Sequence, residues 1–172
     1  MNLLFYIFLT AAPLAGGLGG IYINRGNRNL LKVFMAFSGA YLFSVTMISL
    51  IPEIYHQVDA KVAGLAIIGG FLLQLVFEQF SKGVEHGHLH DHGHSHHQLP
   101  LGIFISLSLH SFLEGMPLGG IFFSNQKTFW SLLGGIALHE LPASFALMTV
   151  MRHETGSASR ALRWLLVYCI MA

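Results

Sequence analysis

Residues 100–123 read PLGIFISLSLHSFLEGMPLGGIFF, an apolar run in which only His110 and Glu114 can carry a charge. A helix needs ~20 apolar residues to cross the hydrocarbon core of a bilayer, so this run is long enough to span it. Comparable charge-poor runs occupy 3–23, 30–51, 62–80 and 129–151, and a shorter one occupies 164–172. The sequence therefore predicts an all-α polytopic membrane helical bundle, with five complete transmembrane helices and the start of a sixth.

The composition supports a membrane protein. Hydrophobic residues make up 53% of the chain, charged residues 10%, and the mean hydropathy is +0.61, whereas a soluble domain carries roughly 25% charged residues. The net charge of +1 gives nucleic-acid binding no electrostatic basis. The single cysteine, Cys169, excludes an intrachain disulfide framework and a cysteine-based zinc module. Histidine, by contrast, is abundant, with 11 residues against 9 lysines and arginines.

The distribution of lysine and arginine predicts the topology. The connections after spans one, three and five, with the adjoining helix end, hold Arg25, Arg28, Lys32, Lys82, Arg152, Arg160 and Arg163. The other two connections hold only Lys61 and Lys127. Cytoplasmic loops of membrane proteins carry the excess of positive charge, so we expect the N-terminus outside and the odd connections in the cytoplasm. We expect an integral protein of the cell (inner) membrane, with residues 1–172 forming a single domain that is C-terminally incomplete.

A histidine-rich loop lies between spans three and four, where residues 85–97 read EHGHLHDHGHSHH. Its histidines are His86, His88, His90, His92, His94, His96 and His97. Imidazole suits zinc, copper, iron and nickel, and closely spaced histidines can chelate in many pairs. We expect a cytoplasmic, auxiliary metal-binding loop. The alternative is a solvated linker that binds metal only incidentally.

Two His–Glu pairs lie near the middle of spans four and five. Glu114 follows His110 by one helical turn, which puts both on one helix face, and His139 is followed directly by Glu140. His110 and His139 occupy the same depth in antiparallel runs, and ionisable residues at that depth are costly unless they face a cavity or a cation. Two imidazoles and two carboxylates suit a divalent transition metal. A single membrane histidine also often serves only as a hydrogen-bond partner between helices.

Prolines and glycines add to this pattern. Pro117 and Pro142 each follow a candidate ligand by three residues, and proline kinks or breaks a helix. Broken helices near the midplane are a usual setting for transporter sites. Glycines at 16, 17, 19 and 20 predict close packing of the first helix, because small residues let helix backbones approach.

These motifs resemble the Zrt/Irt-like (ZIP) family of divalent metal transporters. Residues 110–115, HSFLEG, resemble the fourth-helix motif of that family, and residues 139–142, HELP, resemble its fifth-helix motif. The resemblance implies a fold of eight helices that moves divalent metal from outside, or from a compartment lumen, into the cytosol. It also implies a metal site between helices four and five that is sometimes binuclear.

The resemblance implies roles for individual residues. His110, Glu114 and His139 are the expected ligands of the first metal position. Ser111, a weak ligand, and Glu140 are expected at a neighbouring second position, with Glu114 bridging the two. The sequence departs from the family pattern at Ala143, where many relatives carry a ligand, at Ser111, where asparagine is frequent, and in its short sixth helix.

The expected function is therefore transport of divalent metal, with zinc favoured and iron, manganese or cadmium as alternatives. The metal is the substrate, and we expect no resident cofactor and no enzyme activity. The alternative hypotheses are a metal-efflux carrier, a membrane metal sensor or binding protein and, least favoured, an intramembrane metalloprotease. The His-Glu-x-x-His signature of such proteases is interrupted here at Ala143. The partners expected are the metal ion and the lipid bilayer, with no nucleic acid and a homodimer as one option.

Overall fold

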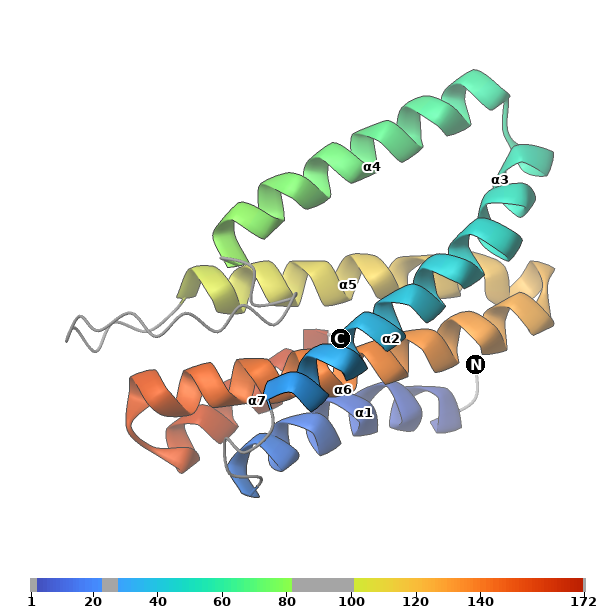
Figure 1. The fold of residues 1–172 in the computed structure, drawn as a ribbon. Coiled ribbons are helices and arrows are strands. Elements are labelled where there is room, and N and C mark those ends of the chain that lie inside the picture. The colour runs from blue at the N-terminus through green and yellow to red at the C-terminus, as the bar shows by residue number, and fades with distance from the viewer. Residues whose placement is uncertain (1–2, 23–27, 82–100, 172) are drawn as a thin grey trace.

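The computed structural model describes residues 3–22, 28–81 and 101–171, which are helical almost throughout and contain no strand (Figure 1). The helices are α1 (Leu3–Tyr22), α2 (Arg28–Val45), α3 (Ile51–Gln57), α4 (Ala60–Ser81), α5 (Leu101–Ser124), α6 (Gln126–Thr155) and α7 (Ala158–Met171). Four helical segments of the described residues are long and apolar enough to cross a membrane, namely Leu31–Gln57, Ala60–Phe77, Leu101–Gly120 and Gln126–Thr155. Helix α1 contains a shorter apolar stretch, Phe5–Ile21. The protein is an all-α membrane bundle, as the sequence predicts.

The second membrane helix is continuous from α2 into α3 through a π turn, η1 (Thr46–Leu50). Pro52 lies in the first turn of α3, just after this wide turn. A proline ring clashes with the carbonyl group four residues earlier in a regular α-helix, and a π turn relieves such crowding by widening the backbone. The helix therefore passes its proline without ending.

Helices α5 and α6 also continue through their prolines, Pro117 and Pro142. Neither helix is interrupted beside the candidate ligands. Membrane helices tolerate proline where neighbouring helices and hydroxyl side chains cover the disturbed backbone. Pro142 is buried in the bundle, and the Ser144 hydroxyl donates to the Glu140 carbonyl at 2.6 Å.

The last described helix begins earlier than its apolar run. Helix α6 ends at Thr155 and is capped by Gly156, which adopts a left-handed conformation with φ 61°. Glycine is the residue that most readily closes a helix in this way. Helix α7 then starts at Ala158 rather than near Trp164. The apolar run 164–172 therefore covers only the later part of this helix, because the first turns of α7 contain Arg160 and Arg163.

Helix α6 lies at the centre of the bundle and contacts α1, α2, α5 and α7 (Figure 1). A side chain at Gly16 would collide with the Leu141 carbonyl and the Ser144 hydroxyl of α6, and one at Gly17 would collide with Leu165 of α7. The close packing predicted from the glycines of α1 is therefore confirmed. Helix α4 leans away from this centre and packs mainly against α5 (Figure 1).

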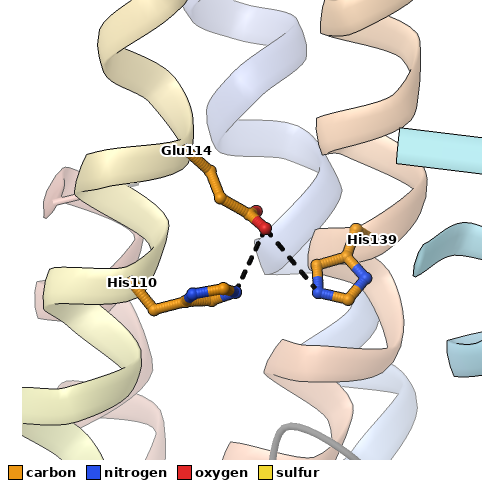
Figure 2. Close-up of side chains that lie close together, drawn as sticks. All are labelled: His110, Glu114 and His139. Atoms are coloured by element: carbon orange, nitrogen blue, oxygen red, sulfur yellow. Dashed lines mark ion pairs between the residues drawn. The ribbon is translucent and has the colours of Figure 1, made fainter. Parts of the chain in front are cut away.

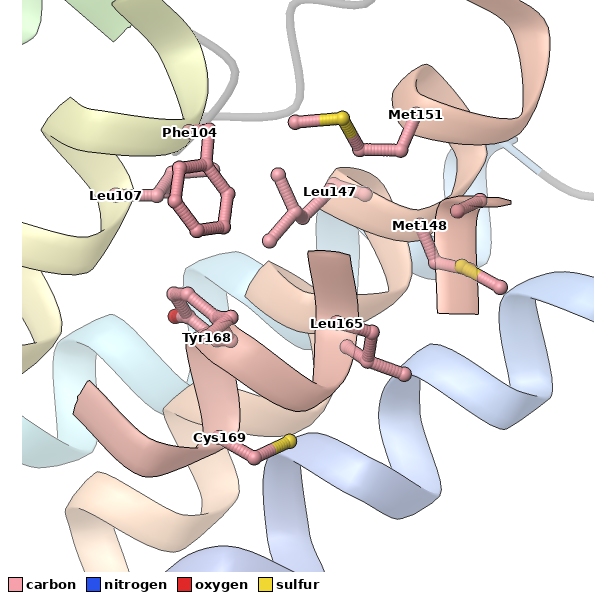
Figure 3. Packing of buried hydrophobic residues seen from close by; sticks show 10 residues of the cluster. Phe104, Leu107, Leu147, Met148, Met151, Leu165, Tyr168 and Cys169 are labelled. Atoms are coloured by element: carbon pink, nitrogen blue, oxygen red, sulfur yellow. The ribbon is translucent and has the colours of Figure 1, made fainter. Parts of the chain in front are cut away.

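Two apolar clusters fill the bundle at different heights. The α5–α7 cluster (Figure 3) consists of Phe104, Leu107, Ala146, Leu147, Met148, Met151, Ala161, Leu165, Tyr168 and Cys169. The α1–α6 cluster consists of Leu9, Val45, Leu118, Phe129, Leu132, Leu133 and Ile136. Along both α5 and α6, the residues between the two clusters are those of the two His–Glu motifs. The polar residues are thus enclosed above and below by packed apolar side chains.

Candidate metal centre

The fourth-span motif brings His110 and Glu114 together on one face of α5. They are one helical turn apart, and His110 Nε2 lies 3.1 Å from Glu114 Oε1. The regular helical spacing suffices to produce this contact, because side chains at i and i+4 are neighbours on a helix surface.

The third member comes from α6, where His139 faces the same carboxylate. His139 Nε2 lies 3.9 Å from Glu114 Oε1, and the two imidazole rings have their centroids 5.9 Å apart (Figure 2). The three residues each offer one ligand atom, and these atoms all lie within 4.8 Å of one another. The prediction that the two motifs meet at one depth is correct for these three residues.

The spacing of these atoms suits a small cation. Zinc lies about 2.0–2.2 Å from nitrogen and oxygen ligands, so two ligands of a tetrahedral ion are about 3.4 Å apart. The Nε2–Oε1 distances of 3.1 and 3.9 Å bracket this value. The side chains are largely enclosed, with exposed fractions of 15% for His110, 20% for Glu114 and 13% for His139.

Both imidazoles have a further partner on the side away from Glu114. His110 Nδ1 lies 3.3 Å from Gln74 Oε1 of α4, and His139 Nδ1 lies 3.2 Å from the hydroxyl oxygen of Ser38 on α2. Neither residue is among the site residues predicted from the sequence. Gln74 could have been noticed in the sequence, because it is a polar amide within the apolar run 62–80. Ser38 could not, because it is one of several hydroxyl residues along its helix.

The second candidate carboxylate, Glu140, lies outside the group of three. Its Oε1 accepts a hydrogen bond from the Ser111 hydroxyl at 2.5 Å, and its Oε2 accepts one from the Tyr168 hydroxyl at 2.7 Å. All three side chains are buried. Ser111 and Glu140 therefore meet, as expected, but Tyr168 of α7 completes their contacts, and nothing in the sequence pattern indicated it.

The remaining predicted features lie elsewhere. Ala143 is buried one turn after His139 and offers no ligand atom. The loop histidines at 86, 88, 90, 92, 94, 96 and 97 fall within 82–100, outside the described residues.

Clustered imidazole and carboxylate side chains inside a membrane helical bundle are typical of polytopic membrane proteins that bind or transport metal ions. Residues 100–172, a range that includes α5, α6 and α7, match the family model of the ZIP zinc transporters. The matched segment contains both His–Glu motifs, and the match supports membership of this family and transport of divalent metal ions in general. The family is one of transporters and not of enzymes. No curated protein and no solved structure matches the chain significantly.

Proposed function

We propose that the protein takes up zinc into the cytosol through a site formed by His110, Glu114 and His139. The observation that carries this proposal is the convergence of three ligand atoms from α5 and α6 within 4.8 Å of one another, at the height where neither apolar cluster fills the bundle. The remaining coordination positions are left to water or to further protein ligands.

The free carboxylate oxygen of Glu114 supports a cation at this position. Glu114 Oε2 is buried and has no hydrogen-bond partner among the residues that the structure describes. A buried polar atom without a partner costs roughly 1–3 kcal/mol, and more when it belongs to a charged group. A metal ion bound by both oxygens of Glu114 would remove this cost, because the oxygen that faces the two histidines is Oε1.

The ligand set favours zinc among the divalent metals. Imidazole nitrogen with carboxylate oxygen is a common zinc environment. The same donors accept iron(II), manganese(II) and cadmium(II) with different affinities. We propose zinc as the main substrate and these three as competitors. The His-rich loop of residues 85–97 is proposed as an auxiliary binding segment that gathers the metal on the cytoplasmic side.

The two apolar clusters suggest how the metal crosses. The α5–α7 cluster and the α1–α6 cluster close the two sides of the site, so an ion can enter or leave only when one of them opens. Alternating opening of the two sides moves the ion without a continuous water path. The excess of lysine and arginine on one face supports a cytoplasmic exit on that face.

Ser111 and Glu140 are proposed as a second metal position beside the first, as the family resemblance implies. Both carboxylate oxygens of Glu140 now accept hydroxyl groups, so an ion could bind there only by displacing Ser111 or Tyr168 from an oxygen. We further propose a single transporter domain over residues 1–172 in the cell membrane, with the N-terminus outside and a homodimer as its assembly.

Uptake of radioactive zinc by vesicles that contain the full-length protein tests the main proposal. We expect His110→Ala and Glu114→Ala each to lower the initial rate at least ~100-fold, because loss of a ligand exceeds the ~10–100-fold effect of losing a residue that only supports one. The matched controls are His153→Ala and Glu154→Ala, because His153 and Glu154 also form a His–Glu contact, near the end of α6. We expect both control variants to retain uptake. Unchanged uptake in both site variants would disprove the proposed site.

A further inference from the structure

We propose that Ser38 and Gln74 are positioning residues that hold the two site histidines in the tautomer with the hydrogen on Nδ1, so that each presents its Nε2 lone pair to the metal. This inference rests on the proposed function. It concerns two residues of α2 and α4, outside the segment that matches the family model and outside both His–Glu motifs.

Gln74 determines which nitrogen of His110 carries the hydrogen. Its Oε1, an amide oxygen, lies 3.3 Å from His110 Nδ1, and an amide oxygen can only accept a hydrogen bond. His110 must therefore donate from Nδ1. A neutral imidazole has one N–H, so Nε2, at 3.1 Å from Glu114 Oε1, holds a lone pair that faces the carboxylate.

Ser38 has the same effect on His139 through its hydroxyl group. Ser38 is completely buried, and its hydroxyl donates to the Met35 carbonyl at 3.1 Å. Because a hydroxyl has one hydrogen, the Ser38 oxygen accepts from His139 Nδ1, which lies 3.2 Å away. The lone pair of His139 is then on Nε2, which faces Glu114 Oε1 at 3.9 Å.

Both histidines thus direct electron pairs toward an oxygen that itself carries lone pairs. With both imidazoles neutral this arrangement is repulsive, and either a proton or a metal ion between the three atoms relieves the repulsion. Metal-ligating histidines generally donate their other N–H to an acceptor, and removal of that acceptor typically weakens metal affinity 10–100-fold.

The arrangement also involves two further helices in the site. Helices α5 and α6 supply the ligands, while α2 and α4 supply the acceptors that hold the rings. Helix α4 packs mainly against α5, and a second bond, from the Ser106 hydroxyl to the Phe77 carbonyl at 2.6 Å, fixes its height one turn from Gln74. Gln74 is therefore held where it can meet His110.

The test measures zinc affinity of the full-length protein in detergent by competition with a chromogenic chelator. We expect Ser38→Ala and Gln74→Leu each to weaken zinc binding ~10–100-fold. Gln74→Glu keeps an oxygen acceptor and is expected to stay within a few-fold of the wild type. The matched control is Ser44→Ala, since Ser44 lies on the same helix and donates to the Ala40 carbonyl at 2.8 Å without contacting a histidine.

A second measurement separates positioning from a general structural role. Nitrogen NMR of labelled histidine reports which ring nitrogen carries the hydrogen, and we expect Nδ1–H for both histidines in the zinc-bound wild type and a mixture in the metal-free Gln74→Leu variant. Equal loss of affinity in Gln74→Leu and Gln74→Glu would overturn the inference, because a structural amide would be missing from both. This comparison also decides the matter if Ser38→Ala does not fold.

His110→Ala distinguishes failure of this inference from failure of the proposed function. If Ser38→Ala and Gln74→Leu bind zinc as the wild type does while His110→Ala has lost binding, the positioning role is wrong and the metal site stands. If His110→Ala also binds as the wild type does, the proposed site itself is wrong.

Discussion

Glu114 and Glu140 are two carboxylates in the same layer of the bundle with opposite surroundings. Glu114 faces two imidazole nitrogens and keeps one buried oxygen without a hydrogen-bond partner among the described residues. Both oxygens of Glu140 accept hydroxyl hydrogens, from Ser111 and Tyr168. A residue type at a given depth therefore does not define a metal ligand. The groups that surround it determine whether a cation is needed.

The two carboxylates also face different parts of the bundle. The histidines beside Glu114 contact α2 and α4 through Ser38 and Gln74. Glu140 lies against α7, and the next residue, Leu141, abuts Gly16 of α1. The side with α1 and α7 is closely packed, whereas α4 contacts mainly one neighbour. The ligand group thus adjoins the more loosely packed side, where movement costs fewer contacts.

The largest expected effect comes from exchanging each carboxylate for its amide. Glu114→Gln removes the negative ligand without changing its size, and we expect zinc affinity for the first equivalent to fall ~100-fold or more, beyond the range for supporting residues. Glu140→Gln is expected to change that affinity less than ~10-fold. Calorimetric titration of the purified protein measures both.

For thermal stability we expect the opposite order, with Glu140→Gln more harmful than Glu114→Gln. Glu140→Gln disturbs hydrogen bonds to a carboxylate, which contribute about 1.5–3 kcal/mol each, and is expected to lower the melting temperature in metal-free detergent more than Glu114→Gln does. If Glu140→Gln instead loses the first equivalent of zinc while Glu114→Gln retains it, the assignment of the two carboxylates is reversed.

A smaller effect is expected from Tyr168→Phe. This change keeps the ring in the α5–α7 cluster but leaves Glu140 Oε2 without the hydroxyl at 2.7 Å. An unsatisfied buried acceptor costs about 1–3 kcal/mol, so we expect lower thermal stability with unchanged zinc affinity. Tyr55→Phe, at an exposed tyrosine of α3, is the control. A loss of zinc affinity in Tyr168→Phe would show that Glu140 belongs to the first metal position.

The sequence predicts the membrane class and the metal group because both depend on local pattern. Apolar runs mark the spans, and the spacing of His110 and Glu114 on one helix determines their contact. Matched depth in antiparallel helices was enough to bring His139 to the same carboxylate. These inferences need only helical periodicity and the thickness of a bilayer.

The partners of these residues could not be predicted in the same way. Ser38, Gln74 and Tyr168 reach the site from three other helices, and which face of each helix turns inward depends on packing between segments far apart in sequence. Hydropathy cannot indicate that face, since lipid-facing and core-facing residues are both apolar. The orientation of Glu140 away from the group of three has the same cause, because α7 provides a hydroxyl where the pattern suggested a metal.

The glycines test the closely packed side directly, and the smallest expected effect is that of Gly119→Ala. A Cβ at Gly16 would collide with the Leu141 carbonyl and the Ser144 hydroxyl, whereas one at Gly119 of α5 meets nothing within 4 Å. Overpacking typically costs 1–3 kcal/mol, and alanine is favoured over glycine in a helix by roughly 0.5–1 kcal/mol. We expect Gly16→Ala to lower the melting temperature and Gly119→Ala to raise it slightly, with zinc affinity unchanged in both. If Gly16→Ala weakened zinc binding as strongly as Ser38→Ala, the packing of α1 would have to influence the ligand geometry through α6. The sides of the bundle around Glu114 and Glu140 would then not act independently.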